Sequence, residues 1–329
     1  MNTDDPAPDP PVARQPRVLN VTVDAEEANR RLDNFLVARL KGVPRAHVYR
    51  IIRSGEVRVN SRRAPASHRL EEGDRVRIPP VRQAPGTAGR PVQPGSADWL
   101  EARILHEDPD LLVIDKPTGL AVHGGSGVSL GAVELLRAAR PAARFLELVH
   151  RLDRDTSGCL MFAKRASSLR HLQAQFRAGE VEKIYLALLV GRLRDAERLV
   201  EAPLLTTERR GGERHVRVDE RGKPAATRMT VEERLPGATL VRVALLTGRT
   251  HQIRVHAAHI GLPLAGDTRY GQEPDPVVLQ AGLQRLFLHA ASIAVSSPRD
   301  ERVVRVTSPL PEDLRAVLAR LRALRTPAR

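Results

Sequence analysis

The segment of this 329-residue chain best equipped for chemistry is 150–158, which reads His-Arg-Leu-Asp-Arg-Asp-Thr-Ser-Gly. It sets two carboxylates, Asp153 and Asp155, among two arginines and two hydroxyls. Mostly apolar residues at 145–149 and 159–163 flank it, which predicts a charged loop between two buried strands. Ionic groups beside buried strands need partners from elsewhere in the chain, and an enclosed carboxylate is a candidate functional group. A polar surface turn is the ordinary alternative.

Two enzyme classes that use similar residues do not fit this segment. Protein kinases carry His-Arg-Asp in their catalytic loop, but here Leu152 interrupts the triplet and no Asp-Phe-Gly follows. Glycosidases need two carboxylates that face one bond, whereas Asp153 and Asp155, two positions apart, would point to opposite sides of an extended segment. The two carboxylates are therefore not expected to act as a pair.

Two further segments hold side chains capable of chemistry. Tyr185 lies in the strand-like run 183–190, where a tyrosine is most often a core residue. The run 246–256 contains Arg249, His251 and Arg254, and Thr250 is predicted to cap a helix that ends near residue 260. His251, His256 and His259 raise the alternative of a metal site. We expect none, because no carboxylate or thiolate joins them at ligand spacing.

The elements that must position these residues are predicted by their patterns. Buried strands are expected at 111–117 and 183–190, and helices at 129–140, from about 169 to 179, and at 313–325. The glycine-rich loop at 119–125 has neither the spacing of a phosphate-binding loop nor that of a dinucleotide-binding one. Strands mixed with helices in this order predict an α+β domain over 99–329.

The N-terminal part has a different pattern. Two short helices joined by a turn at 42–44, then short alternating strands at 56–60 and 74–78, predict a small α+β domain over 18–80. The second helix would place Val48 and Ile51 on one side and Arg50 and Arg53 on the other. Residues 30–82 hold 14 Lys and Arg against 5 Asp and Glu, in a chain whose net charge is +14. A polyanion is therefore the expected partner.

Composition limits the remaining choices. The proline-rich residues 1–17 predict a disordered tail, and the small and proline residues of 81–98 predict a linker. The single cysteine, Cys159, rules out an intramolecular disulfide and any site built from several thiolates. No basic and apolar leader opens the chain and no run of about 18 apolar residues occurs, so we expect a cytoplasmic protein with no membrane partner.

Taken together, three segments resemble the RluA-type pseudouridine synthases: HRLD-x-x-TSG at 150–158, K-x-Y at 183–185, and G-R-T-H-Q-I-R-V-H at 248–256. The resemblance implies that Asp153 is the catalytic nucleophile, that Arg254 pairs with it, and that Tyr185 stacks on the target base and takes part in proton transfer. It assigns Asp155 no role and implies no cofactor. The substrate-binding residues that it implies are His150, Arg151, Thr156, Arg249 and Ile253. We interpret the similar segments 266–271 and 288–290 as structural.

The N-terminal helices and strands resemble the S4 RNA-binding domain, a helix-turn-helix with a small sheet. The RNA-binding residues expected there are Arg45, Tyr49, Arg50, Arg53, Arg58, Arg62 and Arg63. The resemblance is strongest to family members that modify the RNA of the large ribosomal subunit, which makes that RNA the expected substrate of a monomeric enzyme. Other ribosomal or transfer RNA sites are alternatives, and so is a non-catalytic S4 protein that assists ribosome assembly.

Overall fold

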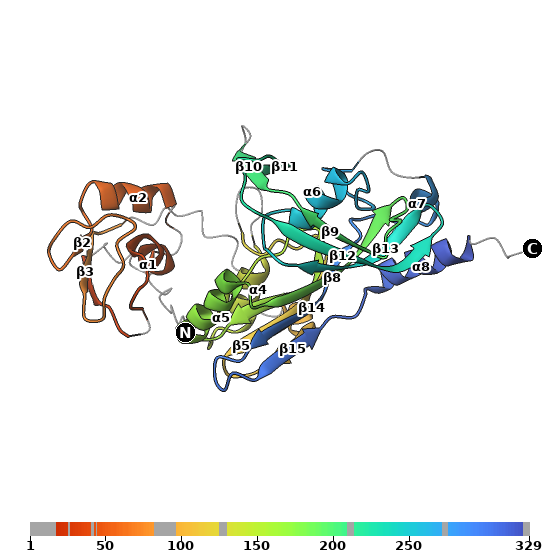
Figure 1. The fold of residues 1–329 in the computed structure, drawn as a ribbon. Helices are drawn as coiled ribbons and strands as arrows, with labels where there is room; N and C mark the ends of the chain where they lie inside the picture. Colours follow the sequence, from red (N-terminus) through yellow and green to blue (C-terminus); the bar gives the residue numbers. More distant parts are fainter. Residues whose placement is uncertain are drawn as a thin grey trace, which may run out of the picture. The chain divides into compact units, whose positions relative to one another are not determined.

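The computed structural model describes residues 18–25, 27–40, 43, 45–81, 97–124, 130–208, 214–271 and 276–324. The chain divides into two compact units, Met1–Pro91 and Val92–Arg329 (Figure 1). The tail expected at 1–17 and nearly all of the linker expected at 81–98 lie outside the described residues. Each unit is described by itself below.

The first unit combines two helices with a three-stranded antiparallel sheet of order β1-β3-β2. Its elements are β1 (Leu19–Thr22), α1 (Leu32–Arg39), α2 (Arg45–Arg53), β2 (Arg58–Val59) and β3 (Arg75–Ile78). Apolar residues of both helices and the sheet form one core, with Phe35, Val48 and Val76 fully buried. The strand predicted at 56–60 is only two residues long, because Asn60 and Ser61 adopt positive φ angles and turn the chain.

The second unit is built on one mixed sheet of ten strands, with a separate two-stranded hairpin. The strands of the large sheet are β4 (Ile104–Glu107), β5 (Leu111–Lys116), β6 (Glu147–Leu148), β7 (Ser157–Ala163), β8 (Glu182–Val190), β9 (Glu197–Glu201), β12 (Ala226–Leu235), β13 (Ala238–Leu245), β14 (Leu288–Ser296) and β15 (Val303–Thr307). The hairpin pairs β10 (Leu204–Glu208) with β11 (Arg214–Val218).

The order of the main sheet is β4-β5-β7-β14-β8-β13-β12-β9, with β15 paired to β14 and β6 paired to β7. Among the described pairings only β7 with β14 is parallel. The late strand β14, blue in Figure 1, therefore lies between two strands from the middle of the chain. The sheet is therefore mixed and mostly antiparallel, and together with its helices it confirms the predicted α+β class.

Successive side chains of a strand point to opposite faces of a sheet. Because apolar side chains point to both faces here, helices cover both. On one face, Leu112 and Leu160 share a core with α4 (Ala132–Ala139) and α6 (Gln252–His259). On the other, Leu111 and Met161 pack with α5 (Ala166–Ala178), while α8 (Glu312–Ala323) covers Leu188 farther along. Short helices α3 (Asp98–Glu101) and α7 (Pro276–Gln280) complete the unit.

The predicted helices α5 and α8 are confirmed, since α5 ends at the left-handed Gly179 and α8 buries one apolar stripe. The helix predicted at 129–140 begins only at Ala132, and residues 125–129 lie outside the described part. Its start follows Gly131, whose N–H donates to Glu134 Oε2 at 2.9 Å.

Candidate active site

Residues 149–156 form the loop that connects β6 to β7, and the buried end of β5 holds this loop in place. Lys116 is fully buried, and its Nζ donates to the carbonyls of Pro117 at 2.8 Å, Leu120 at 2.8 Å and Arg154 at 3.0 Å. The N–H of Gly119 donates to the same Arg154 carbonyl at 2.9 Å. An ammonium group can make three such bonds, so Lys116 ties the loop directly to the sheet.

Asp153 lies between two basic side chains that come from α6 and the residue before it. Its Oδ2 is 3.7 Å from Nη1 of Arg254, and its Oδ1 is 3.7 Å from Nε2 of His251. The Asp153 side chain is 19% exposed and that of Arg254 is 8% exposed. The carboxylate is therefore enclosed on two sides and open on another, and the surface-turn alternative for this loop is wrong.

Arg254 has a closer partner than Asp153. Its Nε and Nη2 donate to the two carboxylate oxygens of Asp267 at 2.8 and 2.7 Å. Burial opposes ionisation of Asp267, but the hydrogen bonds and charge of Arg254 outweigh it, and the pKa of Asp267 is lowered. Asp267, which we interpreted as structural, thus neutralises and orients the guanidinium that faces Asp153.

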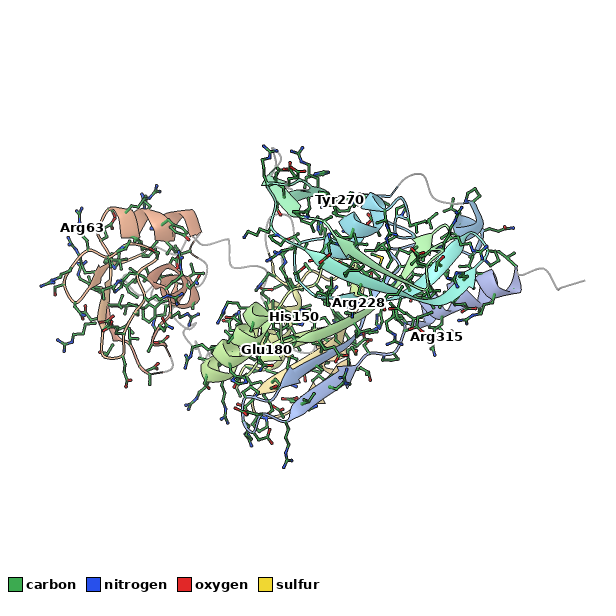
Figure 2. All side chains as sticks on the ribbon, viewed as in Figure 1. Arg63, His150, Glu180, Arg228, Tyr270 and Arg315 are labelled. Carbon is green, nitrogen blue, oxygen red and sulfur yellow. The ribbon has the colours of Figure 1, made fainter. Side chains whose placement is uncertain are left out.

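His251 is the second contact of Asp153 and has an unusual backbone. It precedes α6 with φ 52° and ψ 21°, a left-handed conformation that costs free energy in residues other than glycine. The prediction that Thr250 caps this helix is wrong: the helix begins at Gln252, whose Oε1 accepts the N–H of Arg249 at 3.0 Å. The His251 Nδ1 lies 2.7 Å from the hydroxyl of Tyr270, which Figure 2 labels close to α6.

A cavity of about 610 Å³ opens beside Asp153. All eight of the predicted catalytic and substrate-binding residues line it, namely His150, Arg151, Asp153, Thr156, Tyr185, Arg249, Ile253 and Arg254. Tyr185 comes from β8 and is 8% exposed. Burial, together with the charge of Asp153, raises the pKa of the Tyr185 hydroxyl, so the phenol stays protonated at neutral pH.

The other lining residues divide into supports and exposed cations. His150 stacks on Phe176 with ring centroids 5.1 Å apart, and its Nε2 accepts the N–H of Met161. Thr156 is buried, and its N–H donates to the Asp153 carbonyl at 3.2 Å. Arg151 and Arg249 are exposed at the cavity. The cavity therefore has a half-buried carboxylate at its centre and a positively charged rim.

The histidines of α6 are not arranged as metal ligands. His256 is buried, and its Nε2 is 3.0 Å from the carbonyl of Ala202. Within the described ranges, no group of three His, Cys, Asp or Glu side chains could hold a metal ion. In the same ranges, no helix has the length and apolar character needed to cross a bilayer.

In the first unit, the predicted RNA-binding side chains are mostly exposed. Arg50, Arg53, Arg62 and Arg63 are exposed and Arg58 is half-buried; Figure 2 labels Arg63. The Tyr49 side chain is 39% exposed, and its hydroxyl donates to Asp33 at 3.0 Å. The side chain of Arg45 lies outside the described residues.

The sequence motifs assign no individual role to Lys116, Asp267 or Tyr270, and they indicate His251 only as an alternative metal ligand. One general rule could have indicated Asp267: a buried arginine needs a carboxylate as its partner. The sequence motifs offer Asp153 as that partner, so they do not point to Asp267. Tyr270 was one of three tyrosines in the chain, and nothing local distinguishes it.

Two family models match the chain. The model described as RNA pseudouridylate synthase matches residues 110–259, which contain Asp153, Tyr185 and Arg254, and the S4 domain model matches residues 30–76. "Ribosomal large subunit pseudouridine synthase C" of Escherichia coli strain K12 is 51% identical over 315 residues, which are 94% of this chain and 98% of the relative. The protein of the same name from Haemophilus ducreyi is 51% identical over 304 residues, 92% and 95% of the two chains.

Solved structures agree with these matches. "Human RNA Pseudouridylate Synthase Domain Containing 4" aligns with a TM-score of 0.59 and 28% identity, over 69% of this chain and 95% of that one. "Human RNA Pseudouridylate Synthase Domain Containing 1" aligns with a TM-score of 0.55 and 28% identity, over 67% and 86%. The fold and the enzyme class predicted from the three segments are thereby confirmed, and the chain belongs to the RNA pseudouridine synthases that carry an N-terminal S4 domain.

Proposed function

We propose that this synthase converts uridines of large-subunit ribosomal RNA to pseudouridine, with Asp153 as the nucleophile. The observation that supports the role of Asp153 is its position: an enclosed carboxylate at a 610 Å³ cavity, 3.7 Å from a buried guanidinium. The RNA is proposed from relatives about half identical to the chain over nearly their whole length, whose names specify the ribosomal large subunit.

The reaction is an isomerisation, and the site needs no oxidant or energy source for it. The bond between uracil N1 and ribose C1′ breaks, a bond between C5 and C1′ forms, and the proton of C5 is replaced by one on N1. Asp153 attacks the nucleotide or acts on its ribose in this scheme. Arg254, held by Asp267, keeps a positive charge beside the carboxylate. The ring of Tyr185 stacks on the base in this proposal, and its protonated hydroxyl takes part in proton transfer.

A uridine inside folded RNA must leave its stack to reach Asp153. Flipping costs a few kcal/mol, which contacts to the RNA backbone can offset. The exposed Arg151 and Arg249 at the cavity supply such contacts, and Ile253 supplies an apolar wall for the base. The S4 arginines grip phosphates elsewhere on the RNA, where they add affinity but read little sequence. We expect the enzyme to act as a cytoplasmic monomer without a cofactor.

The test of Asp153 is a comparison of two neighbouring carboxylates. The intact protein, Asp153→Asn and Asp155→Asn are incubated with transcribed large-subunit RNA, and pseudouridines are mapped by carbodiimide-dependent stops of reverse transcription. We expect modification by the intact protein and by Asp155→Asn, whose side chain is exposed, and none by Asp153→Asn. Equal modification by Asp153→Asn would remove it from the mechanism, and an unmodified RNA with all three would exclude this substrate.

The S4 surface is tested separately through salt dependence. Arg50→Ala with Arg53→Ala should weaken RNA binding and reduce the slope of log affinity against log salt by about 0.9 for each duplex phosphate that the variant no longer neutralises. Arg198→Ala, an exposed arginine of the second unit paired with Asp195, is the matched control. An unchanged slope in the double variant would place the RNA on another surface.

A further inference from the structure

A chain of polar contacts leads to Asp153 from the opposite side of His251. The N–H of Val216 in β11 donates to the hydroxyl of Tyr270 at 3.3 Å. The same hydroxyl is 2.7 Å from Nδ1 of His251, and Nε2 of that ring is 3.7 Å from Oδ1 of Asp153. The order is therefore amide, phenol, imidazole, carboxylate, with the carboxylate at the cavity.

These contacts decide which ring nitrogen of His251 carries its proton. Burial lowers the pKa of His251, so the ring is neutral and holds one proton at neutral pH. The Tyr270 hydroxyl, which already accepts from Val216, has one proton to donate; when it donates to Nδ1 of His251, that nitrogen accepts. The ring proton is then on Nε2, the nitrogen that faces Asp153. An Nε2–H group attracts the carboxylate, whereas an unprotonated Nε2 would repel it.

We propose that His251 is a positioning residue for the nucleophile: its Nε2 proton, placed there by Tyr270, holds Oδ1 of Asp153 while Arg254 holds Oδ2. The inference rests on the proposed role of Asp153. The separation of 3.7 Å is longer than a hydrogen bond, and catalytic hydrogen bonds commonly shorten when substrate fills the site. With both oxygens held, the carboxylate cannot rotate and one of its lone pairs faces the cavity.

Two independent features support this role. The left-handed backbone of His251 is retained at a free-energy cost, and it directs the ring between Tyr270 and Asp153. The ring of Tyr270 also lies under the guanidinium of Arg254, whose central carbon Cζ is 5.1 Å from the ring centre. One side chain thus contacts both cationic or proton-donating groups that flank the nucleophile.

The experiment compares the single-turnover rates of the full chain and of two variants, His251→Asn and Tyr270→Phe, at saturating RNA. His251→Asn tolerates a left-handed backbone but is too short to reach Asp153, and Tyr270→Phe removes only the hydroxyl. We expect a loss of about 10- to 100-fold for His251→Asn and about 2- to 10-fold for Tyr270→Phe. The loss should appear in the rate at saturating RNA, which reports on the bound state. RNA affinity should be unchanged. The exposed His259→Gln on the same helix is the control.

A second readout needs no activity. Long-range proton–nitrogen spectra of the imidazoles can be assigned by comparison with His251→Asn. They should show the His251 proton on Nε2 in the intact protein and a mixture of the two neutral tautomers in Tyr270→Phe. The charged and titratable groups around this ring are Asp153, Arg254, Asp267, Arg269 and Tyr270, with His215 beside Tyr270.

The outcomes separate the inference from the proposed function. An intact-protein spectrum with the proton on Nδ1 would overturn the inference. So would wild-type rates in both variants while Asp153→Asn is inactive. If Asp153→Asn itself stays active, the role of Asp153 fails, and the positioning role fails with it.

Discussion

Asp267→Asn is the substitution that tests the electrostatic design of the site most directly. The carboxylate is completely enclosed, with a side-chain exposure of 0%. Its Oδ1 accepts from Nη2 of Arg254 and from the backbone N–H groups of Arg269 and Tyr270. If the asparagine oxygen takes these bonds, its NH₂ group must face Nε of Arg254, where two donors meet and no acceptor is left.

The size of the effect follows from the loss of the counter-charge. Removing one partner of a buried ion pair costs about 3–5 kcal/mol, because the other charge stays buried without compensation. Here Asp153, 3.7 Å from Nη1 of Arg254, retains part of the compensation. We therefore expect Asp267→Asn to lower the free energy of unfolding by about 2–4 kcal/mol.

Urea unfolding followed by tryptophan fluorescence measures this loss of stability in the second structural unit, which contains Asp267. Trp99 is the only tryptophan of the chain and lies in α3 of the second unit, so its signal reports on that unit. Asp195→Asn is the matched control: Asp195 pairs with Arg198 at 3.3 Å, but both side chains are more than half exposed. Such a pair contributes less than about 1 kcal/mol. If Asp267→Asn shifted the urea midpoint no more than Asp195→Asn does, the claim that Asp267 compensates a buried charge would be refuted.

Three further predictions use the same fluorescence assay. Lys116→Met should lower the free energy of unfolding by about 2–5 kcal/mol and also slow catalysis, since the carbonyls of Pro117 and Leu120 lose their donor and that of Arg154 keeps only the Gly119 N–H; a normal single-turnover rate would contradict the anchoring role. Gly158→Ala should lower the free energy of unfolding by about 2–4 kcal/mol, because the added Cβ would lie 2.3 Å from a backbone oxygen at φ +109°. The control Gly119→Ala, which has open space at φ +80°, should lower it by about 1 kcal/mol. Equal losses in the two variants would count against the close contact at Gly158. Burial lowers the pKa of His150 to about 4, so the folded unit binds fewer protons than the unfolded one between about pH 6.5 and 4. Stability should fall as the pH drops through that window, and less so in His150→Gln; identical pH profiles would exclude His150 as the cause.

The parts of the fold that could be predicted are those whose pattern depends on burial alone. Strands β5, β7 and β8 are continuous apolar runs because helices cover both faces of the sheet, and α8 shows a clear stripe because one side faces solvent. The patterns do not predict the long hairpin β12–β13. Charged residues such as Arg228 and Glu232 alternate with its apolar ones, and it turns at Pro236 and Gly237, so its segment resembles a polar loop.

The site divides in the same way. Asp153, Tyr185 and Arg254 could be placed together because three separate motifs contain them. The pairing of Arg254 with Asp267 spans 13 residues and joins a helix to a turn, so no local period or cap predicts it. The same holds for His251 with Tyr270. These contacts depend on how the turn after α6 folds back on the helix, which is decided by tertiary packing.

The place of β14 in the sheet has a consequence for the synthesis of the protein. The strand that follows the Asp153 loop, β7, acquires its parallel neighbour only when residues 288–296 have been made. Until then, β7 and β8 have an unfilled gap between them, and the tyrosine and aspartate of the site are on separate pieces of sheet. A nascent chain therefore cannot complete this part of the sheet until residues 288–296 have left the ribosome.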